Sequence, residues 1–389
     1  MPPPATNLNS LLAASYGTAV GALVFNTQPA IVGALAESFE LTESDLGNII
    51  ATTLIGVFCL VVSSFYWIHR VRRRATLVAG PTAACLGAAG LVMADGFVGV
   101  AASLAILGIG GASVYVVCLS CLASATDPTR AFGVAITMQV AVASLTVYLI
   151  PSFVLPLYGI GGVAVLLILL NALAFGIVPL IPERQPQSSA TGATTSSDSG
   201  LTVWVMLGLV AMTVYFVGLN GTWPFLERIG VTMSLAGDAI GRALAASLLF
   251  GAIGSLIASV TGRRVGIAPA LLLSGTGFLI FIYLMLEPSG VTTFTVALVI
   301  FNAAWNFSLP YQMDLISQAD AHHRFIVLVP AAQTIGGAMG PAIAGPLLMS
   351  SGVMGVYAQL IVCVVAAFLL YGFIANRLAK HHEVTERHV

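Results

Sequence analysis

Long apolar runs, separated by short polar turns, cover almost all of the chain. Six runs lie in the first half, near residues 10–36, 44–67, 75–95, 97–124, 131–156 and 159–181. Six more lie in the second half, near residues 201–227, 236–261, 267–287, 290–317, 324–350 and 352–378. About 20 consecutive apolar residues let an α-helix cross a bilayer. The pattern therefore predicts an all-α integral membrane protein with twelve transmembrane helices.

One polar stretch interrupts this pattern, the segment PERQPQSSATGATTSSDSG at residues 182–200. Its Ser, Thr, Gly and Pro residues cannot bury apolar area, so we expect a flexible linker on the cytoplasmic side. The linker separates a predicted six-helix bundle at residues 1–181 from a second one at residues 201–380. Residues 381–389 are expected to form a cytoplasmic tail.

The composition indicates that lipid surrounds the chain. Only 7% of the residues are Asp, Glu, Lys or Arg, while 58% are hydrophobic and the mean hydropathy is +1.00. Soluble domains carry about 25% charged residues, because their surface faces water. The net charge of −1 also argues against nucleic acid as a partner, since nucleic acid would require a basic surface.

Several chemical activities are disfavoured. The sequence holds no Gly-rich phosphate loop with a following lysine, and the turns are too short for a catalytic domain, so we expect neither an enzyme nor ATP-driven transport. Cys118 and Cys121 form a CxxC motif inside an apolar run with no nearby His. We interpret both cysteines as packing residues and predict no metal site and no cofactor.

The charged residues divide between the two sides of the predicted membrane. All Lys and Arg residues except Arg228 and Arg242 fall in alternate turns or tails on one side. The other side holds the carboxylates Glu37, Glu40, Glu43, Asp45, Asp95, Glu227, Asp238 and Glu287. Because cytoplasmic loops retain Lys and Arg, both termini are expected in the cytoplasm. The short loops favour a bacterial inner membrane protein.

The two halves repeat one another in sequence. Arg324 and Gln333 repeat Arg130 and Gln139 at an offset of 194 residues, and Asn220 repeats Asn26 at the same offset. Arginine turns follow the second run of each half, at residues 70–74 and 263–264. Such a parallel repeat is one of the schemes on which secondary transporters are built.

These features resemble the major facilitator superfamily over essentially the whole chain. The turn HRVRRRATL, from His69 to Leu77, is similar to the family's signature turn between its second and third helices. The signature's aspartate is replaced by His69 and its glycine by Arg72. In the second half, Gly262, Arg263 and Arg264 match the signature, while Ser259 stands in the place of the acid. The match at the entry to the first half consists of Pro29, Leu35, Leu41 and Gly47.

The resemblance implies two six-helix bundles around a central cavity that opens alternately to either side. The segment GGAMGPAIAG, at residues 336–345, is similar to a signature that antiporters of this superfamily carry in the fifth helix. Here the fifth run reads AVASLTVYLIP instead, which argues against antiport.

Two acidic residues are candidates for proton coupling. Asp314 lies about one turn inside the predicted cytoplasmic end of its run, and Glu227 lies at the outer end of the seventh run. A charged side chain at the centre of a membrane helix costs about 2.5–3.5 kcal/mol, so such residues tend to be functional. The alternative for Asp314 is a static latch with the arginine turns.

Charged residues near the turns are candidates for gates that form and break as the protein changes state. They are Arg70, Arg73, Arg74, Asp127, Arg130, Asp238, Arg263, Arg264, Asp320 and Arg324. Arg242 has two main interpretations. It either anchors the carboxylate of a solute in the cavity or pairs with Asp238, four residues earlier on the same helix face, or with Glu227. The remaining alternative is that its side chain extends to the lipid headgroups.

Polar and aromatic residues within the runs are candidates for binding a solute. They are Asn26, Gln28, Tyr115, Gln139, Asn220, Trp223, Arg242, Asn302, Trp305, Asn306, Tyr311 and Gln333. Uncharged amides beside aromatic rings suit a small solute with an apolar or aromatic body and a few hydrogen-bonding groups. For each amide, helix packing is the alternative.

Together these observations predict a secondary transporter that takes up a small organic solute, aromatic or carboxylate-bearing, with protons as the coupling ion. Proton-driven efflux of amphipathic or drug-like compounds is the alternative. We expect the protein to act as a monomer in the lipid bilayer.

Overall fold

A computed structural model describes residues 8–68, 70–123, 125, 128–181, 199–261, 264–286, 290–319 and 328–386. Within these ranges the chain forms helices and no strand, as the sequence predicts. The helices of the first half are α1 (Leu8–Gly21), α2 (Leu23–Asn26), α3 (Gln28–Ser38), α4 (Glu43–Trp67), α5 (Arg73–Met93), α6 (Gly96–Ala123), α7 (Pro128–Leu149), η1 (Ile150–Val154), α8 (Leu155–Leu173) and η2 (Ala174–Leu180).

The second half continues in the same manner. Its helices are α9 (Ser199–Thr222), η3 (Trp223–Phe225), α10 (Leu226–Thr232), α11 (Gly237–Thr261), α12 (Ile267–Leu286), α13 (Val291–Ala319), α14 (Val329–Ser351) and α15 (Val353–Glu386). Each predicted apolar run therefore becomes one helix or a series of short helices.

Nine helical stretches in the described residues are long and apolar enough to cross a membrane. The predicted number was twelve. The difference arises because the run 10–36 is broken into short helices, α7 and α8 join into one stretch at residues 133–180, and α14 is rich in Gly and Pro. Large apolar side chains such as Leu272 and Leu169 face outward, at 72% and 58% exposure. This is the surface expected of helices surrounded by lipid.

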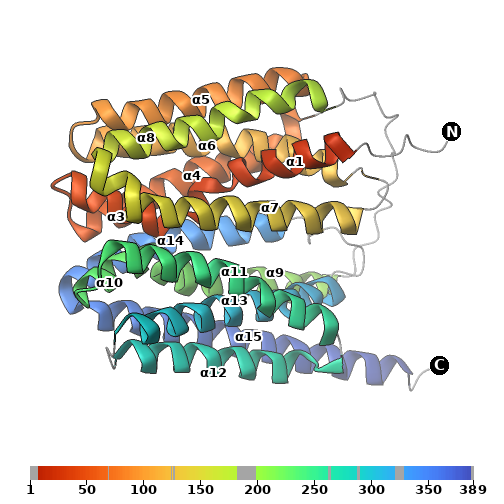
Figure 1. Ribbon diagram of the computed structural model, residues 1–389. Coiled ribbons are helices and arrows are strands. Elements are labelled where there is room, and N and C mark those ends of the chain that lie inside the picture. Colours follow the sequence, from red (N-terminus) through yellow and green to blue (C-terminus); the bar gives the residue numbers. More distant parts are fainter. Residues whose placement is uncertain are drawn as a thin grey trace.

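The helices lie side by side, and the described chain begins and ends at the same end of the assembly (Figure 1). We call the end at which α1 begins and α15 ends the terminal end. The opposite end, which holds the turn at residues 39–42 and the helix α10, is the distal end. An even number of crossings explains why both ends of the chain lie together.

Most packing occurs within each half of the chain. In the first half α6 packs on α5, α4 and α1, and in the second half α13 packs on α11 and α12, while α9 packs on α15 and α14. The two halves meet where α4 contacts α14, where α7 contacts α11, and where α3 contacts η3 and α10. These contacts are the seam between the two halves.

The backbone repeats between the halves at a glycine turn. Gly159, at a kink inside α8, has φ 59° and ψ −157°. Gly352, between α14 and α15, has φ 61° and ψ −157°. A positive φ costs little only for glycine, which has no Cβ. The two turns have nearly the same conformation, in agreement with the repeat seen in the sequence.

An aromatic cluster fills the interior of the second half. The ring of Tyr215 on α9 stacks on Phe368 of α15, with 5.8 Å between centroids. Phe301 on α13 contacts Phe278 of α12 at 5.7 Å and Trp305 of its own helix at 6.0 Å. Where the structure describes the first half, ring contacts are confined to Tyr148 and Phe153.

Candidate functional site

At the distal end, glycines let the two halves approach closely. Gly47 of α4 lies against the carbonyl oxygen of Pro341 on α14. A Cβ on Gly345 of α14 would lie 2.9 Å from Cα of Ser44 on α4. A Cβ on Gly241 of α11 would lie 2.8 Å from Cγ of Pro151. The seam is therefore closed at this end by contacts that leave no room for a side chain.

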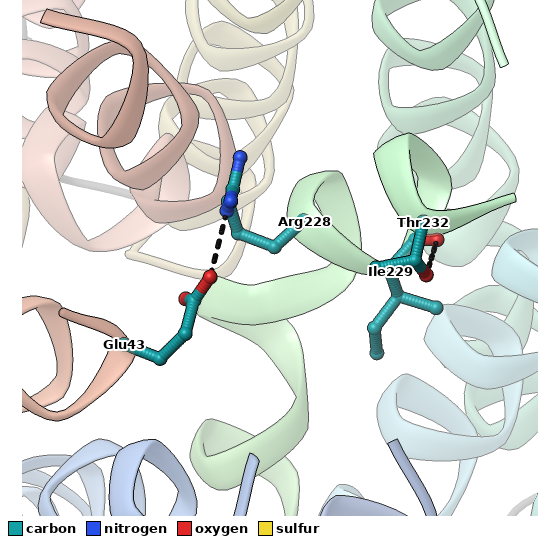
Figure 2. A network of polar contacts seen from close by, with 4 residues as sticks. All are labelled: Glu43, Arg228, Ile229 and Thr232. Carbon is teal, nitrogen blue, oxygen red and sulfur yellow. Dashed lines mark hydrogen bonds and ion pairs between the residues drawn. The ribbon is translucent and has the colours of Figure 1, made fainter. Parts of the chain in front are cut away.

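An ion pair crosses the same seam. Nε of Arg228, on α10, donates to Oε1 of Glu43, on α4, at 3.1 Å (Figure 2). The two side chains are 25% and 24% exposed. Thr42 orients Glu43 by starting α4 with a capping box, in which its hydroxyl accepts from the backbone N–H of Asp45 at 3.1 Å. The pair is thus held at the first residue of a well-capped helix.

This ion pair is expected to stabilise the closed distal end by a modest amount. Partly exposed pairs contribute up to about 1 kcal/mol, which is about fivefold in population. We therefore expect Glu43→Gln to raise the labelling rate of a Ser44→Cys reporter by up to about fivefold. The measurement uses a polar maleimide and a chain in which the five natural cysteines are replaced. The exchanged pair, Glu43→Arg with Arg228→Glu, should restore slow labelling; continued fast labelling would contradict the assignment.

Glu227 lies beside this pair and is 3% exposed. Its carboxyl group packs against Gly33 of α3, in the other half, at a position where any Cβ would collide with it. Its Oε2 atom is buried and has no hydrogen-bond partner. The nearest charged groups are Arg228, Glu37 and Glu43. A carboxyl group of the second half is therefore enclosed by a helix of the first half.

Asp314, the second acidic candidate, lies in a different environment. It is partly exposed on α13, and its Oδ2 accepts a hydrogen bond from Nε2 of Gln318 at 2.7 Å. It lines a cavity of about 490 Å³ at the terminal end, between α11, α12, α13 and α15. Tyr311 lines the same cavity, and its hydroxyl lies 2.7 Å from Oγ1 of Thr261. This cavity lies inside the second half, away from the seam.

The candidate solute-binding residues differ in exposure. Those that are buried are Gln28, Asn220, Trp223, Asn302, Trp305 and Tyr311. Those that are partly exposed are Asn26, Tyr115, Gln139, Asn306 and Gln333. Asn302 joins α13 to α11, because its Nδ2 donates to Oγ of Ser247 at 3.1 Å, whereas Nδ2 of Asn306 donates within α13 to the Asn302 carbonyl at 2.8 Å. Gln28 and Asn220, in contrast, keep buried amide atoms without partners.

Arg242 pairs with Asp238 on its own helix. Both side chains are about half exposed, at 57% and 47%. Of the two interpretations from the sequence, this geometry favours the local pair over an anchor for the carboxylate of a solute. It also places Asp238 in a contact within α11 and not across the seam.

Comparison with known proteins identifies the family. The sequence matches the Major Facilitator Superfamily over residues 14–324. The chain belongs to this superfamily. Its members are transporters and not enzymes, and the protein is accordingly a multi-pass membrane protein.

Solved structures of the superfamily share the fold. A crystal structure of a D-xylose-proton symporter matches with a TM-score of 0.74 and 16% identity, covering 94% of this chain and 97% of that one. The xylose transporter XylE from E. coli, in a partially occluded inward open conformation, has a TM-score of 0.71 and 15% identity over 93% and 97%. The nucleoside transporter NupG has a TM-score of 0.68 and 9% identity over 95% and 99%. A search of curated sequences gave no match.

The signature turn of the superfamily lies at the terminal end. Arg70, Arg74 and Arg264 are exposed there, and Arg73 is partly exposed. The candidates Asp127, Arg263, Asp320 and Arg324 lie outside the described residues, as does the side chain of Arg130. A shallow, open groove of about 560 Å³ lies along the terminal half of α7, lined by Gly133, Val134, Thr137, Met138 and Ala141. The transporter is thus closed at the distal end, with open space beside α7 nearer the terminal end.

Sequence reasoning did not find the contacts that close the distal end. Glu43 was grouped with Glu227 among the carboxylates of one side but was not paired with Arg228, 185 residues away. Gly33 and Gly241 received no role, and Gly345 was noted only as part of the segment at residues 336–345. A signal existed for Glu43, since Thr42 and Asp45 have the spacing of a capping box and mark the first turn of a helix.

Proposed function

We propose that this superfamily member takes up a small organic solute across a bacterial inner membrane, driven by protons, with both termini in the cytoplasm and the distal end outside. The observation that carries the proposal is the enclosure of the Glu227 carboxyl group by Gly33 at the closed seam. The proton symporter among the structural neighbours supports the same conclusion.

The physical argument concerns the cost of enclosing a charge. An ionised carboxylate taken out of water without a paired partner costs several kcal/mol. Arg228 is the nearest cation, but Glu43 already accepts from it, and Glu37 and Glu43 add negative charge nearby. The distal end should therefore close readily only when Glu227 has bound a proton. When that end opens, the carboxyl group meets water and can exchange its proton with the outside.

Asp314 is the weaker choice for the same role. Its carboxylate is partly exposed and accepts a hydrogen bond from Gln318, so ionisation costs less there. It also lies far from the contacts that open and close the distal end. We therefore propose no coupling role for Asp314, which lines the cavity between the helices of the second half.

Replacing Glu227 by Gln is expected to uncouple the transporter. Glutamine has the size of the protonated acid but cannot release a proton, so the distal end should close at any pH. In proteoliposomes, solute exchange without a gradient should continue, while accumulation driven by a pH gradient should disappear. Asp314→Asn is the matched control and should retain accumulation.

The same vesicles separate uptake from efflux. Solute should accumulate inside when the outer pH is the lower one and the distal end faces outward. Accumulation only under the reversed gradient would favour efflux. Coupling of solute to protons would be refuted by one result: proton uptake that no solute changes and that is the same in Glu227→Gln and Asp314→Asn as in the wild type.

A further inference from the structure

Two helices are interrupted at corresponding positions of the repeat. In the first half the helix stops at Ala22 and again at Thr27 before α3 begins with Gln28 and Pro29. In the second half α9 ends at Thr222 and passes through η3 before α10 begins. The two sites match at the same offset that relates Asn26 to Asn220. Interrupted helices in corresponding halves of a transporter place backbone and side-chain polar groups where a solute binds.

Each interruption carries a buried side-chain amide with at least one atom that has no hydrogen-bond partner. Gln28 is 0% exposed, and neither its Nε2 nor its Oε1 has a hydrogen-bond partner. Asn220 is also 0% exposed; its Nδ2 donates to the Phe216 carbonyl at 3.2 Å, while its Oδ1 has no partner. Buried amide atoms without partners are costly, and they are retained where a ligand supplies the missing hydrogen bonds.

The two amides lie at the seam between the halves. The helix α3, which begins with Gln28, packs on η3, which directly follows the turn of helix that carries Asn220. Asn220 faces Gly337 of α14, whose Cβ would also touch Leu54 of α4 at 3.4 Å. Trp223, the first residue of η3, is 2% exposed and supplies an aromatic surface at the same place.

The two arginines of α10 and α11 are already paired, and Glu37 is exposed at the distal end of α3, nine residues after Gln28. Arg228 is bound to Glu43, and Arg242 is bound to Asp238. An anionic solute would therefore find neither arginine available. Glu227 holds a proton when the distal end is closed, according to the function proposed above, so it offers no charge to a cationic solute.

We infer that Gln28 and Asn220 bind an uncharged solute that carries both hydrogen-bond donors and acceptors, such as a hydroxylated or amide-bearing compound. The inference rests on the proposed transport function and narrows its solute class. Gln28 can donate and accept at the same time, and Asn220 presents an acceptor. This combination matches a neutral polar molecule better than a carboxylate.

The first test needs no knowledge of the solute. Gln28→Met keeps the volume of the side chain and removes both amide atoms that lack partners. We expect the thermal unfolding midpoint of the solute-free protein to rise by a few degrees, because an unsatisfied buried group has been removed. The control is Thr276→Val, a change of similar size at an exposed position of α12 where the hydroxyl bonds only to a carbonyl of its own helix; it should leave the midpoint nearly unchanged. A fall in the midpoint would show that Gln28 already has partners and would overturn the inference.

The second test identifies the charge class. The wild-type protein is screened by thermal shift against a metabolite library with equal numbers of neutral, cationic and anionic compounds. We expect the hits to be neutral compounds with donors and acceptors, and their affinity to fall about tenfold or more in Gln28→Met and in Asn220→Leu but not in Thr276→Val. Amino and carboxyl derivatives of each hit should bind more weakly than the neutral parent.

The outcomes separate the inference from the proposed function. Charged hits that proteoliposomes transport would leave the transporter in place and overturn the neutral solute class. Neutral hits whose affinity is unchanged in both variants would overturn the assigned residues. If no compound of any class binds or is transported, the inference and the proposed function both fail.

Discussion

Replacing Gly47 by valine is expected to reduce net transport strongly while leaving the protein folded. The new side chain would collide with the carbonyl oxygen of Pro341 on α14, and a backbone atom at a helix contact cannot move aside cheaply. Overpacking of this kind costs about 1–3 kcal/mol, which shifts the population away from the closed distal end by about 5- to 150-fold. Uptake into proteoliposomes should fall by a similar factor, and a Ser44→Cys reporter should be labelled faster.

Gly372→Val is the matched control for this experiment, because no atom lies within 4 Å of the Cβ that it would add. It should retain uptake. Normal uptake in Gly47→Val would mean that the distal closure is not a state of the transport cycle, and that the contacts of Gly345 and Arg228 there have no role in gating.

Replacing Gly110 by valine is expected to destabilise the folded protein, whereas Gly47→Val should affect transport and leave the fold intact. Gly110 lies on α6 inside the first half, and its Cβ would be 2.6 Å from the carbonyl oxygen of Gly80 on α5. Because both helices belong to one half, we expect them to stay in contact throughout the cycle, so that no alternative state relieves the clash. Small residues at such contacts let membrane helices pack closely. With an overpacking cost of about 3 kcal/mol and one six-helix half as the unfolding unit, we expect the unfolding midpoint in detergent to fall by about 6–12 °C.

The two substitutions together separate packing within a half from packing between the halves. Gly47→Val should unfold at nearly the wild-type temperature, whereas Gly110→Val should not be recovered in good yield. Equal destabilisation of both variants would indicate that the two halves form a single rigid unit, and movement between them would then be excluded as the basis of transport.

Much of the fold can be predicted from the sequence because lipid imposes a simple rule. Each helix must satisfy its own backbone hydrogen bonds and cover itself with apolar side chains, so every crossing leaves a long apolar run. The interruptions inside the runs are harder to predict. The run 10–36 was expected to be one helix, but it is divided at Ala22 and Thr27. Pro29 was the available signal, since proline is favoured in the first turn of a helix.

The candidate site can be predicted only in part, because its contacts join residues that are far apart in the chain. The spacing of Asp238 and Arg242 is local, so their meeting on one helix face could be expected. The contact of Glu43 with Arg228 depends on how the two bundles pack against each other. The hydrophobic periodicity of the sequence carries no information on that packing. The same holds for Gly33, whose role becomes visible only once the Glu227 carboxyl group is seen against it.

The aromatic cluster of the second half has a mechanical consequence. Rings from α9, α12, α13 and α15 interlock around Tyr215 and Phe301, and interlocked rings resist sliding because any shift opens voids. Close contacts of small residues hold both halves together, at Gly87 and Gly110 in the first and at Gly254 and Gly336 in the second, so the rings are an additional source of stiffness in the second half. During each turnover the second half should therefore behave as the more rigid of the two bodies.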